Sequence, residues 1–187
     1  MTPFGQLILG GYTPLILMLV TLGLVFFISF RIHTLQYTTA LGLFLIYAGL
    51  LGAALTSIFV VYTGASITRV FFISAAAFGA LSLYGYTTQR DLSPIGSFLI
   101  MGLFGLIIAI VVNILLKSSG LDFVISAAGV LIFAGLTAWD TQKIKEMYDV
   151  NDDGTVSGRK AVMGALSLYL DFINLFLMLL RLVGDRR

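Results

Sequence analysis

The sequence predicts an all-α integral membrane protein, and three observations support that prediction. Hydrophobic residues make up 59% of the 187-residue chain and charged residues only 11%, whereas a soluble domain carries roughly 25% charged residues. A soluble fold of this size could not hide so much apolar side chain from water. The charges are also clustered, so runs such as 32–68 and 92–116 are uncharged and exceed the roughly 20 residues that a membrane-spanning helix needs.

The first half of the chain contains three of six predicted membrane helices. The first, Thr13–Phe30, follows a start that is apolar but broken by Pro3 and three glycines, and it ends before Arg31. The next two, Ala40–Tyr62 and Ser66–Thr87, carry one charge between them and are separated by three residues.

The second half contains the other three. Ile95–Leu116 begins beside Pro94, a residue suited to the first turn of a helix. A polar stretch at 149–158 separates Asp122–Tyr148 from Arg159–Leu182. Because the connections are short, sequential helices are expected to pack antiparallel as neighbours, and we predict a single transmembrane domain over 1–187.

Composition and motifs argue against several classes of function. The net charge of +2 rests on only 11 lysines and arginines, too few for a phosphate-binding face, so we expect no nucleic-acid partner. The chain has no cysteine and one histidine, and it contains no HExxH, P-loop or GxGxxG motif. We therefore predict that the protein is not an enzyme and holds no resident metal or cofactor.

One polar segment, Asp149–Lys160 (DVNDDGTVSGRK), has part of the spacing of an EF-hand calcium loop. The last position of such a loop is a bidentate glutamate, but here it is Lys160, whose positive charge opposes a calcium ion. Asp, Asn and Gly also favour ordinary turns. We predict a polar turn between two helices, with weak attraction of cations as the alternative.

Small residues form stripes on three of the predicted helices. They include Gly42, Gly49 and Gly52 on the second, Gly79 on the third, and Gly102 with Gly105 on the fourth. In lipid, helices attract one another through close backbone approach and hydrogen bonds, because there is no hydrophobic force between them. We predict that these stripes are helix-packing faces.

The last predicted helix differs because polar residues follow one of its faces. Gly164, Ser167, Asp171, Asn174 and Met178 recur at intervals of three and four, so they share that face. A polar seam on an apolar helix should be turned toward protein or water rather than lipid. We therefore place this helix in the interior of the bundle.

Asp171 stands near the middle of this helix, where an aspartate costs about 2.5–3.5 kcal/mol to insert. Such a residue is a candidate for function and needs a partner, and Asp140 on the preceding helix is the carboxylate best placed to reach it. Two ionised carboxylates about 4 Å apart repel by about 4 kcal/mol at an effective dielectric of about 20. A pair that meets would therefore share a proton and titrate as a unit. The alternative is that Asp171 hydrogen-bonds another polar side chain and only fixes packing.

Three segments resemble bacterial members of the Bax inhibitor-1 family, also called the transmembrane Bax inhibitor motif family. GALSLYLDFINLFLMLLRLVG (Gly164–Gly184) is similar to the C-terminal signature, LTAWDTQKIK (Leu136–Lys145) to the penultimate-helix motif, and SLYGYTTQRDLS (Ser82–Ser93) to the mid-chain loop. The resemblance implies a fold of seven helices with the C-terminal one central in the bundle. Since six spans are visible, we expect this chain to lack the family's first helix.

The resemblance also implies a function, a pH-sensitive calcium leak channel in the bacterial cytoplasmic membrane, with calcium as the transported ion. The family's di-aspartyl pair falls on Asp140 and Asp171, which would form the ion pathway and pH sensor. An arginine that can pair with the first aspartate corresponds to Arg31 as a counter-ion. An arginine at a helix end is also typical of an interfacial anchor.

A different class of function stays open, because family members are also linked to the regulation of other membrane proteins. The partner would be a quality-control protease or a cell-death factor. The polar seam with Ser167 and Asn174 would then be a packing core, and lipid-facing stripes would form the docking surface.

Overall fold

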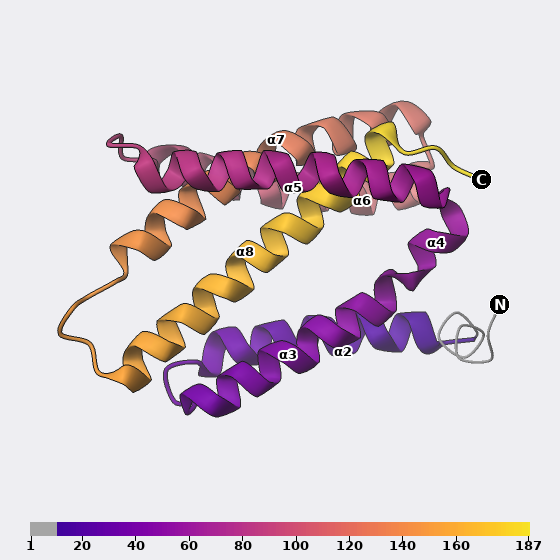
Figure 1. Cartoon of the computed structure of the whole chain (residues 1–187). Coiled ribbons are helices and arrows are strands. Elements are labelled where there is room, and N and C mark those ends of the chain that lie inside the picture. The colour runs from indigo at the N-terminus through magenta and orange to yellow at the C-terminus, as the bar shows by residue number, and fades with distance from the viewer. Residues whose placement is uncertain (1–10) are drawn as a thin grey trace. The chain divides into compact units, whose positions relative to one another are not determined.

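The computed structural model describes residues 11–187, and most of them are helical (Figure 1). Five of the described helices are long and apolar enough to cross a bilayer, and α2 adds a shorter apolar stretch, Ile16–Arg31. The predicted class, a multi-pass all-helical membrane protein, is confirmed. In chain order the elements are α2 (Thr13–Arg31), α3 (Tyr37–Ala54), η1 (Leu55–Ser57), α4 (Ile58–Val61), α5 (Gly64–Thr87), α6 (Ser93–Leu116), α7 (Ser119–Glu146) and α8 (Gly154–Val183).

The predicted spans agree with these helices to within a few residues, except at two places. One is the second span, which the structure divides into α3, the short 3-10 turn η1 and α4. The hydroxyl groups of Thr56 and Ser57 donate back to the carbonyls of Ala53 and Ala54, at 2.7 and 3.1 Å. Such bonds compete with the helical ladder, which accounts for the tightened turn at this point.

The other exception is the last helix, which begins at Gly154 rather than Arg159. The Asp153 carboxylate accepts the backbone N–H of Val156 at 2.8 Å, and this is the bond that an N-cap residue makes. The expected absence of the family's first helix concerns the start of the chain, where residues 1–10 lie outside the described part.

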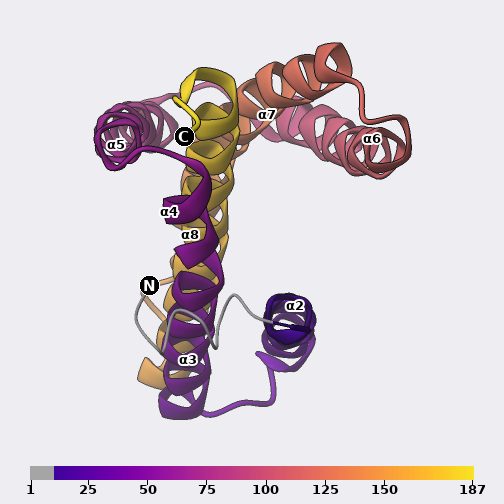
Figure 2. The ribbon, with the colours of Figure 1, turned by 90° about the vertical axis from the view of Figure 1, so that its right-hand side faces the viewer.

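The described helices group into two compact units. The first comprises α2 to α4, residues 148–166 and the C-terminal pair 186–187. Within it α2 packs against α3 (Figure 2). Gly158 leaves room for the ring of Tyr37, since a Cβ at position 158 would lie 2.5 Å from the ring carbon Cδ2.

The second unit, residues 64–147 and 167–185, is organised around α7, which packs against both α5 and α6. Glycines set the distance at both contacts. A Cβ added at Gly85 of α5 would lie 2.1 Å from the carbonyl oxygen of Ala138, and one at Gly96 of α6 would lie 2.1 Å from the Trp139 ring. Close approach at small residues is the usual way in which membrane helices gain packing energy.

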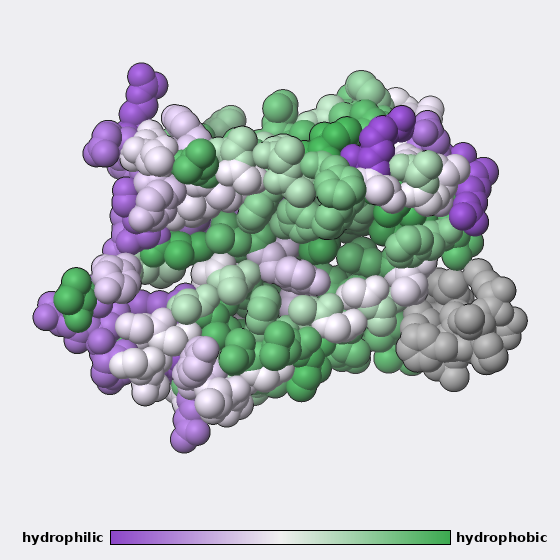
Figure 3. Space-filling model, in the orientation of Figure 1, coloured by the Kyte–Doolittle hydropathy of each residue, from purple (hydrophilic) through white to green (hydrophobic). Residues whose placement is uncertain are grey.

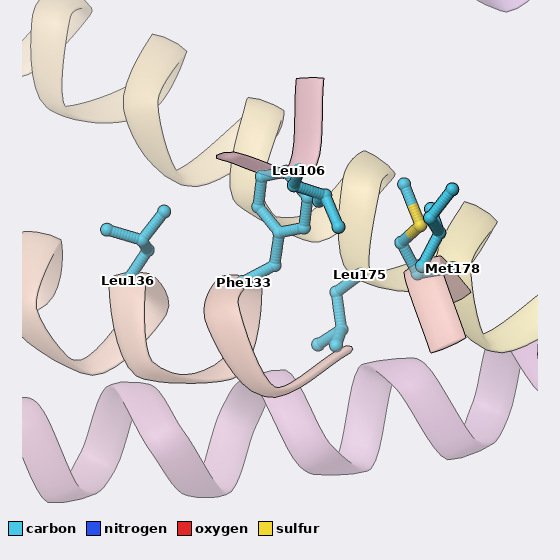
Figure 4. Close-up of a cluster of buried hydrophobic side chains, with 6 residues drawn as sticks. Leu106, Phe133, Leu136, Leu175 and Met178 are labelled. Atoms are coloured by element: carbon cyan, nitrogen blue, oxygen red, sulfur yellow. The ribbon is translucent and has the colours of Figure 1, made fainter. Parts of the chain in front are cut away.

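A cluster of buried apolar side chains joins α6, α7 and the C-terminal half of α8 in this unit (Figure 4). In an apolar 18-residue stretch of α7, and likewise of α8, 39% of the residues are buried, whereas the share in α6 is 6%. Both α7 and α8 are thus more buried than α6, and the central position of the last helix among all the others stays a prediction. The cluster consists of Leu106, Ile125, Phe133, Leu136, Leu175 and Met178.

Among the glycines of the predicted small-residue stripes, Gly102 on α6 faces a neighbouring helix closely, since a Cβ there would lie 3.3 Å from Cδ1 of Ile132. In the part of the chain that the structure describes, no neighbouring atom comes within 4 Å of a Cβ built at Gly42, Gly49, Gly52, Gly79 or Gly105. Within each unit, these five positions are therefore not close packing contacts. The closest contacts lie at glycines such as Gly85 and Gly96. There the backbone of Ala138 or the ring of Trp139 occupies the space that a side chain would take.

On the face drawn in Figure 3 the described residues are largely apolar, and the most hydrophilic ones gather near helix ends. Phe98 and Ile114 on α6 are 67% and 66% exposed. An apolar surface of this extent suits a lipid surrounding rather than water.

Candidate functional site: a carboxyl pair in an apolar pocket

The second unit brings Asp140 and Asp171 together. Asp140 comes from α7 and Asp171 from α8, and their carboxyl groups lie within side-chain hydrogen-bonding reach of each other. Asp140 is half-buried, whereas Asp171 is only 5% exposed. The sequence left contact between these two residues open, and the structure places both in the lining of one pocket. Their role as ion pathway and pH sensor stays a prediction.

The connection between the two helices makes this meeting feasible. Asp140 lies six residues before the end of α7, or about 9 Å, and Asp171 lies 17 residues after the start of α8, or about 26 Å. A tight antiparallel hairpin would therefore leave the carboxyl groups about 17 Å out of level. The seven residues 147–153 can extend over about 25 Å, which is enough to make up the difference.

The two carboxyl groups line a pocket of about 490 Å³ between α6, α7 and α8. Its apolar wall is formed by members of the buried cluster, including Leu106, Phe133 and Met178 (Figure 4). Ser167 and Asn174, the other polar members of the seam on α8, line the same pocket. The seam is thus turned toward protein, as its sequence pattern predicts.

One oxygen in the pocket lacks a hydrogen-bond partner. Within the described structure, Oδ2 of Asp171 is buried and accepts no hydrogen bond. The neighbouring amide does not supply one, because Nδ2 of Asn174 donates to the Leu170 carbonyl at 2.8 Å. An unpaired buried acceptor costs about 1–3 kcal/mol, and such exceptions in a native structure call for an explanation.

One basic side chain outside the predicted site, Lys143, also lines the pocket. Lys143 follows Asp140 by three residues on the same face of α7, lines the pocket and attracts the Asp140 carboxylate. Its ammonium lies 5.2 Å from the centroid of the Trp139 ring, within the range of a cation–π contact. The spacing of Asp140 and Lys143 within LTAWDTQKIK was the available signal for this pair.

Arg31 belongs to the first unit and the carboxyl pair to the second. Arg31 is exposed in the last turn of α2, where a positive charge interacts favourably with the helix dipole. Its role as a counter-ion to Asp140 stays a prediction.

The EF-hand-like segment has the contacts of a turn and a helix cap. Asp149 accepts the backbone N–H of Asn151 at 2.9 Å and its side-chain amide at 3.0 Å, and these bonds hold the pKa of Asp149 below its ordinary value. Lys160 pairs with Asp152 at 2.5 Å. Among the described residues, no three His, Cys, Asp or Glu side chains cluster closely enough to hold a metal ion.

The geometry allows simple acid–base chemistry at the pair. Two ionised carboxylates at hydrogen-bonding distance repel strongly in a site shielded from water. A proton between them removes that repulsion and provides the hydrogen bond that the buried acceptor lacks. Loss of that proton leaves two like charges that either separate or attract a cation.

Five of the described helices are long and apolar enough to cross a bilayer, and two of them hold a carboxyl pair between them. These features define a multi-pass membrane protein. The chain belongs to the Bax inhibitor-1 family, since the family model described as inhibitor of apoptosis-promoting Bax1 matches residues 1–187. It is 53% identical over 186 residues to an uncharacterised protein of Rickettsia prowazekii, covering 100% of this chain and 75% of that protein.

Two further relatives are described as membrane proteins. The Escherichia coli inner membrane protein YbhL is 49% identical over 173 residues, which is 91% of this chain and 74% of that protein. An uncharacterised membrane protein of Streptococcus pyogenes is 45% identical over 145 residues, which is 78% of this chain and 63% of that protein. This chain is accordingly a multi-pass protein of the bacterial cytoplasmic membrane, surrounded by lipid.

Proposed function

We propose that the protein is a pH-sensitive leak channel for calcium, in which Asp140 and Asp171 form a proton-operated latch. The observation that supports this most directly is the pairing of the two carboxyl groups from α7 and α8 inside an apolar pocket. A shared proton holds α7 and α8 together. Its loss pushes the helices apart or recruits a cation, and calcium is the transported substrate of the open state.

Membrane depth favours a functional reading of Asp171. It lies 12 residues from the end of α8, or about 18 Å, and about 26 Å from the start. Ionisable residues at such depth are rare and usually mark ion or proton pathways. Arg31 would act as the counter-ion to Asp140 in one state of the channel.

The test is calcium flux into liposomes that contain the purified chain, measured at several pH values between about 6 and 8. The variant Asp171→Asn removes the charge and keeps the shape, so it should alter flux and flatten the pH dependence. Asp185→Asn is the matched control, because Asp185 is exposed and pairs with Arg69 at 3.0 Å. An Asp171→Asn variant with the flux and pH response of the unmodified chain would rule out the latch.

The description of the family as inhibitors of apoptosis-promoting Bax1 favours a second function, a membrane-embedded regulator that binds another membrane protein. The same liposomes discriminate between the two. Calcium flux without any partner supports the channel, whereas absence of flux together with co-purification of a membrane protein from its native membrane supports the regulator.

A further inference from the structure

The pocket beside the carboxyl pair has the size and lining of a small-molecule site. Its volume is about 490 Å³, within the roughly 300–1,000 Å³ of ligand pockets, which are mostly apolar with a few polar groups that fix orientation. Ten of its fifteen lining residues are aliphatic, aromatic or methionine. The polar ones are Asp140, Lys143, Ser167, Asp171 and Asn174.

One acceptor in the polar part of the pocket, Oδ2 of Asp171, has no hydrogen-bond donor facing it in the described structure. Asp171 is 5% exposed, and its Oδ2 has no hydrogen-bond partner in the described structure. The side-chain amide of Asn174 is already bonded to a carbonyl of its own helix. When the carboxyl pair has lost its shared proton, a ligand that fits here must therefore donate a hydrogen bond, which excludes a carboxylate or a phosphate as the group that meets Asp171.

The charge of the pocket specifies the ligand further. Its charged lining groups are Asp140, Asp171 and Lys143, so with both carboxylates ionised the wall carries one net negative charge. Lys143 is exposed and lies over the Trp139 ring, which leaves Asp171 without a cation in direct contact. One monovalent cation with N–H donors would balance the charge and satisfy the oxygen together.

Part of the pocket lining on α6 is both apolar and exposed. Ile100 and Ile107 line the pocket and are 37% and 49% exposed. On a helix that crosses the bilayer, side chains of this kind contact lipid tails. A ligand entering past them needs an apolar body as well as a charged head.

We propose that this pocket binds an amphiphile with a single primary ammonium group, the ammonium at Asp140 and Asp171 and the apolar chain along Leu106, Phe133 and Met178. The site shares Asp171 with the channel described above but does not depend on calcium passing through the protein. Because the test measures binding and not flux, either proposal can fail while the other stands.

Dodecylamine is the probe, titrated against the full chain in nanodiscs. Trp139 is the only tryptophan of the chain and lines the pocket, so its fluorescence reports occupancy directly. We expect a saturable change that Asp171→Asn weakens at least about tenfold, the effect of losing one hydrogen bond to a charged group. Asp185→Asn should bind like the unmodified chain.

Two more variants keep the proposal testable should Asp171→Asn fold poorly. Lys143→Gln removes the competing positive charge and should tighten binding. Ile107→Phe narrows the pocket and should weaken it, whereas Ile108→Phe is the matched control, since Ile108 is 64% exposed on the same helix and is not among the lining residues.

Related amphiphiles separate charge from hydrogen bonding. Dodecyltrimethylammonium has the charge without an N–H group, and dodecanol has a donor without the charge, so both should bind more weakly than dodecylamine. Weaker dodecylamine binding in nanodiscs that contain phosphatidylethanolamine than in pure phosphatidylcholine would identify a lipid headgroup as the natural source of the ammonium; equal binding would indicate a free amine. Equal affinity for all three probes, or dodecylamine binding unchanged in both Asp171→Asn and Ile107→Phe, overturns the proposal.

Discussion

Gln142 on α7 and Asp171 on α8 are buried to nearly the same degree, 6% and 5% exposed, yet their surroundings differ. The side-chain oxygen of Gln142 accepts the Leu92 N–H at 2.8 Å, and its amide donates to the Arg90 carbonyl at 2.8 Å. Asp171 keeps one oxygen without a partner. A fully satisfied polar group stabilises a fold, whereas an unsatisfied one marks a place where a proton or ligand completes the structure.

Gln142 belongs to a set of hydrogen bonds that fixes the connection between α5 and α6. Residues 88–92 lie outside both helices, so their backbone groups need other partners. Gln142 supplies two of these bonds, and Lys145 of α7 donates to the Tyr86 carbonyl at 2.8 Å. Because Gln142 is hydrogen-bonded and Asp171 has an unpaired oxygen, substitutions at these two residues should affect stability in opposite ways.

The largest effect is expected from Gly85→Ala. Its Cβ would lie 2.1 Å from the carbonyl oxygen of Ala138, a backbone atom that cannot rotate away, so α5 and α7 must separate. We expect a loss of about 3 kcal/mol, or several degrees in the melting temperature at about 2–4 °C per kcal/mol.

The matched control for Gly85→Ala is Gly79→Ala on the same helix, where no neighbouring described atom lies within 4 Å of the new Cβ. It should leave stability unchanged or raise it by up to about 1 kcal/mol through helix propensity. Equal melting temperatures for the two variants in thermal unfolding of the detergent-solubilised protein would contradict the close contact of α5 with α7.

A smaller loss is expected from Gln142→Leu. The substitution removes both side-chain bonds and leaves the Leu92 N–H and the Arg90 carbonyl without them, at a cost of about 1–3 kcal/mol. Hydrogen exchange at the Leu92 amide should rise, because this amide loses its acceptor. Gln89→Leu, at an exposed position of the same connection, is the control and should change neither quantity.

Asp171→Asn should behave in the opposite way, with little or no loss of stability. An aspartate at a helix centre costs about 2.5–3.5 kcal/mol on insertion scales, and an amide relieves the repulsion from Asp140. We expect a melting temperature equal to or above that of the unmodified chain, alongside the altered flux proposed above. A drop as large as that of Gln142→Leu would assign Asp171 to packing, the alternative that the sequence left open.

Much of this architecture follows from the sequence because its physics is local. Charge-free runs locate helices such as α5 and α6, and the spacing of Ser167, Asp171 and Asn174 shows which face of α8 turns inward. The break at η1 and the early start of α8 depend on side-chain bonds to the backbone. Those bonds are invisible in a hydropathy pattern.

The packing contacts were less predictable, because they depend on what faces each residue. The glycine stripes on α3 and α6 have the spacing of a packing face, yet the closest contacts form at Gly85 and Gly96, which meet Ala138 and Trp139. No periodicity identifies the partner across an interface. The pocket is likewise a property of three helices together, so the sequence located its carboxyl groups but not its apolar wall or Lys143.

The smallest effect concerns Asp149, an exposed carboxylate that accepts two hydrogen bonds from Asn151, in contrast to the buried Asp171. Hydrogen bonds from Asn151 lower the pKa of Asp149, so the ionised form is favoured in the folded chain. Its contribution is therefore present above the unfolded value of about 3.9 and is lost as the pH falls through the folded pKa. Asp149→Ala should destabilise the connection between α7 and α8 slightly at neutral pH and not at all in strong acid.

An NMR titration of the Asp149 carboxyl should show a midpoint below about 3.9. The variant Asn151→Ala should raise this midpoint only partly, because the backbone N–H of residue 151 remains. A midpoint at or above the ordinary value would mean that this turn does not hold its carboxylate as described.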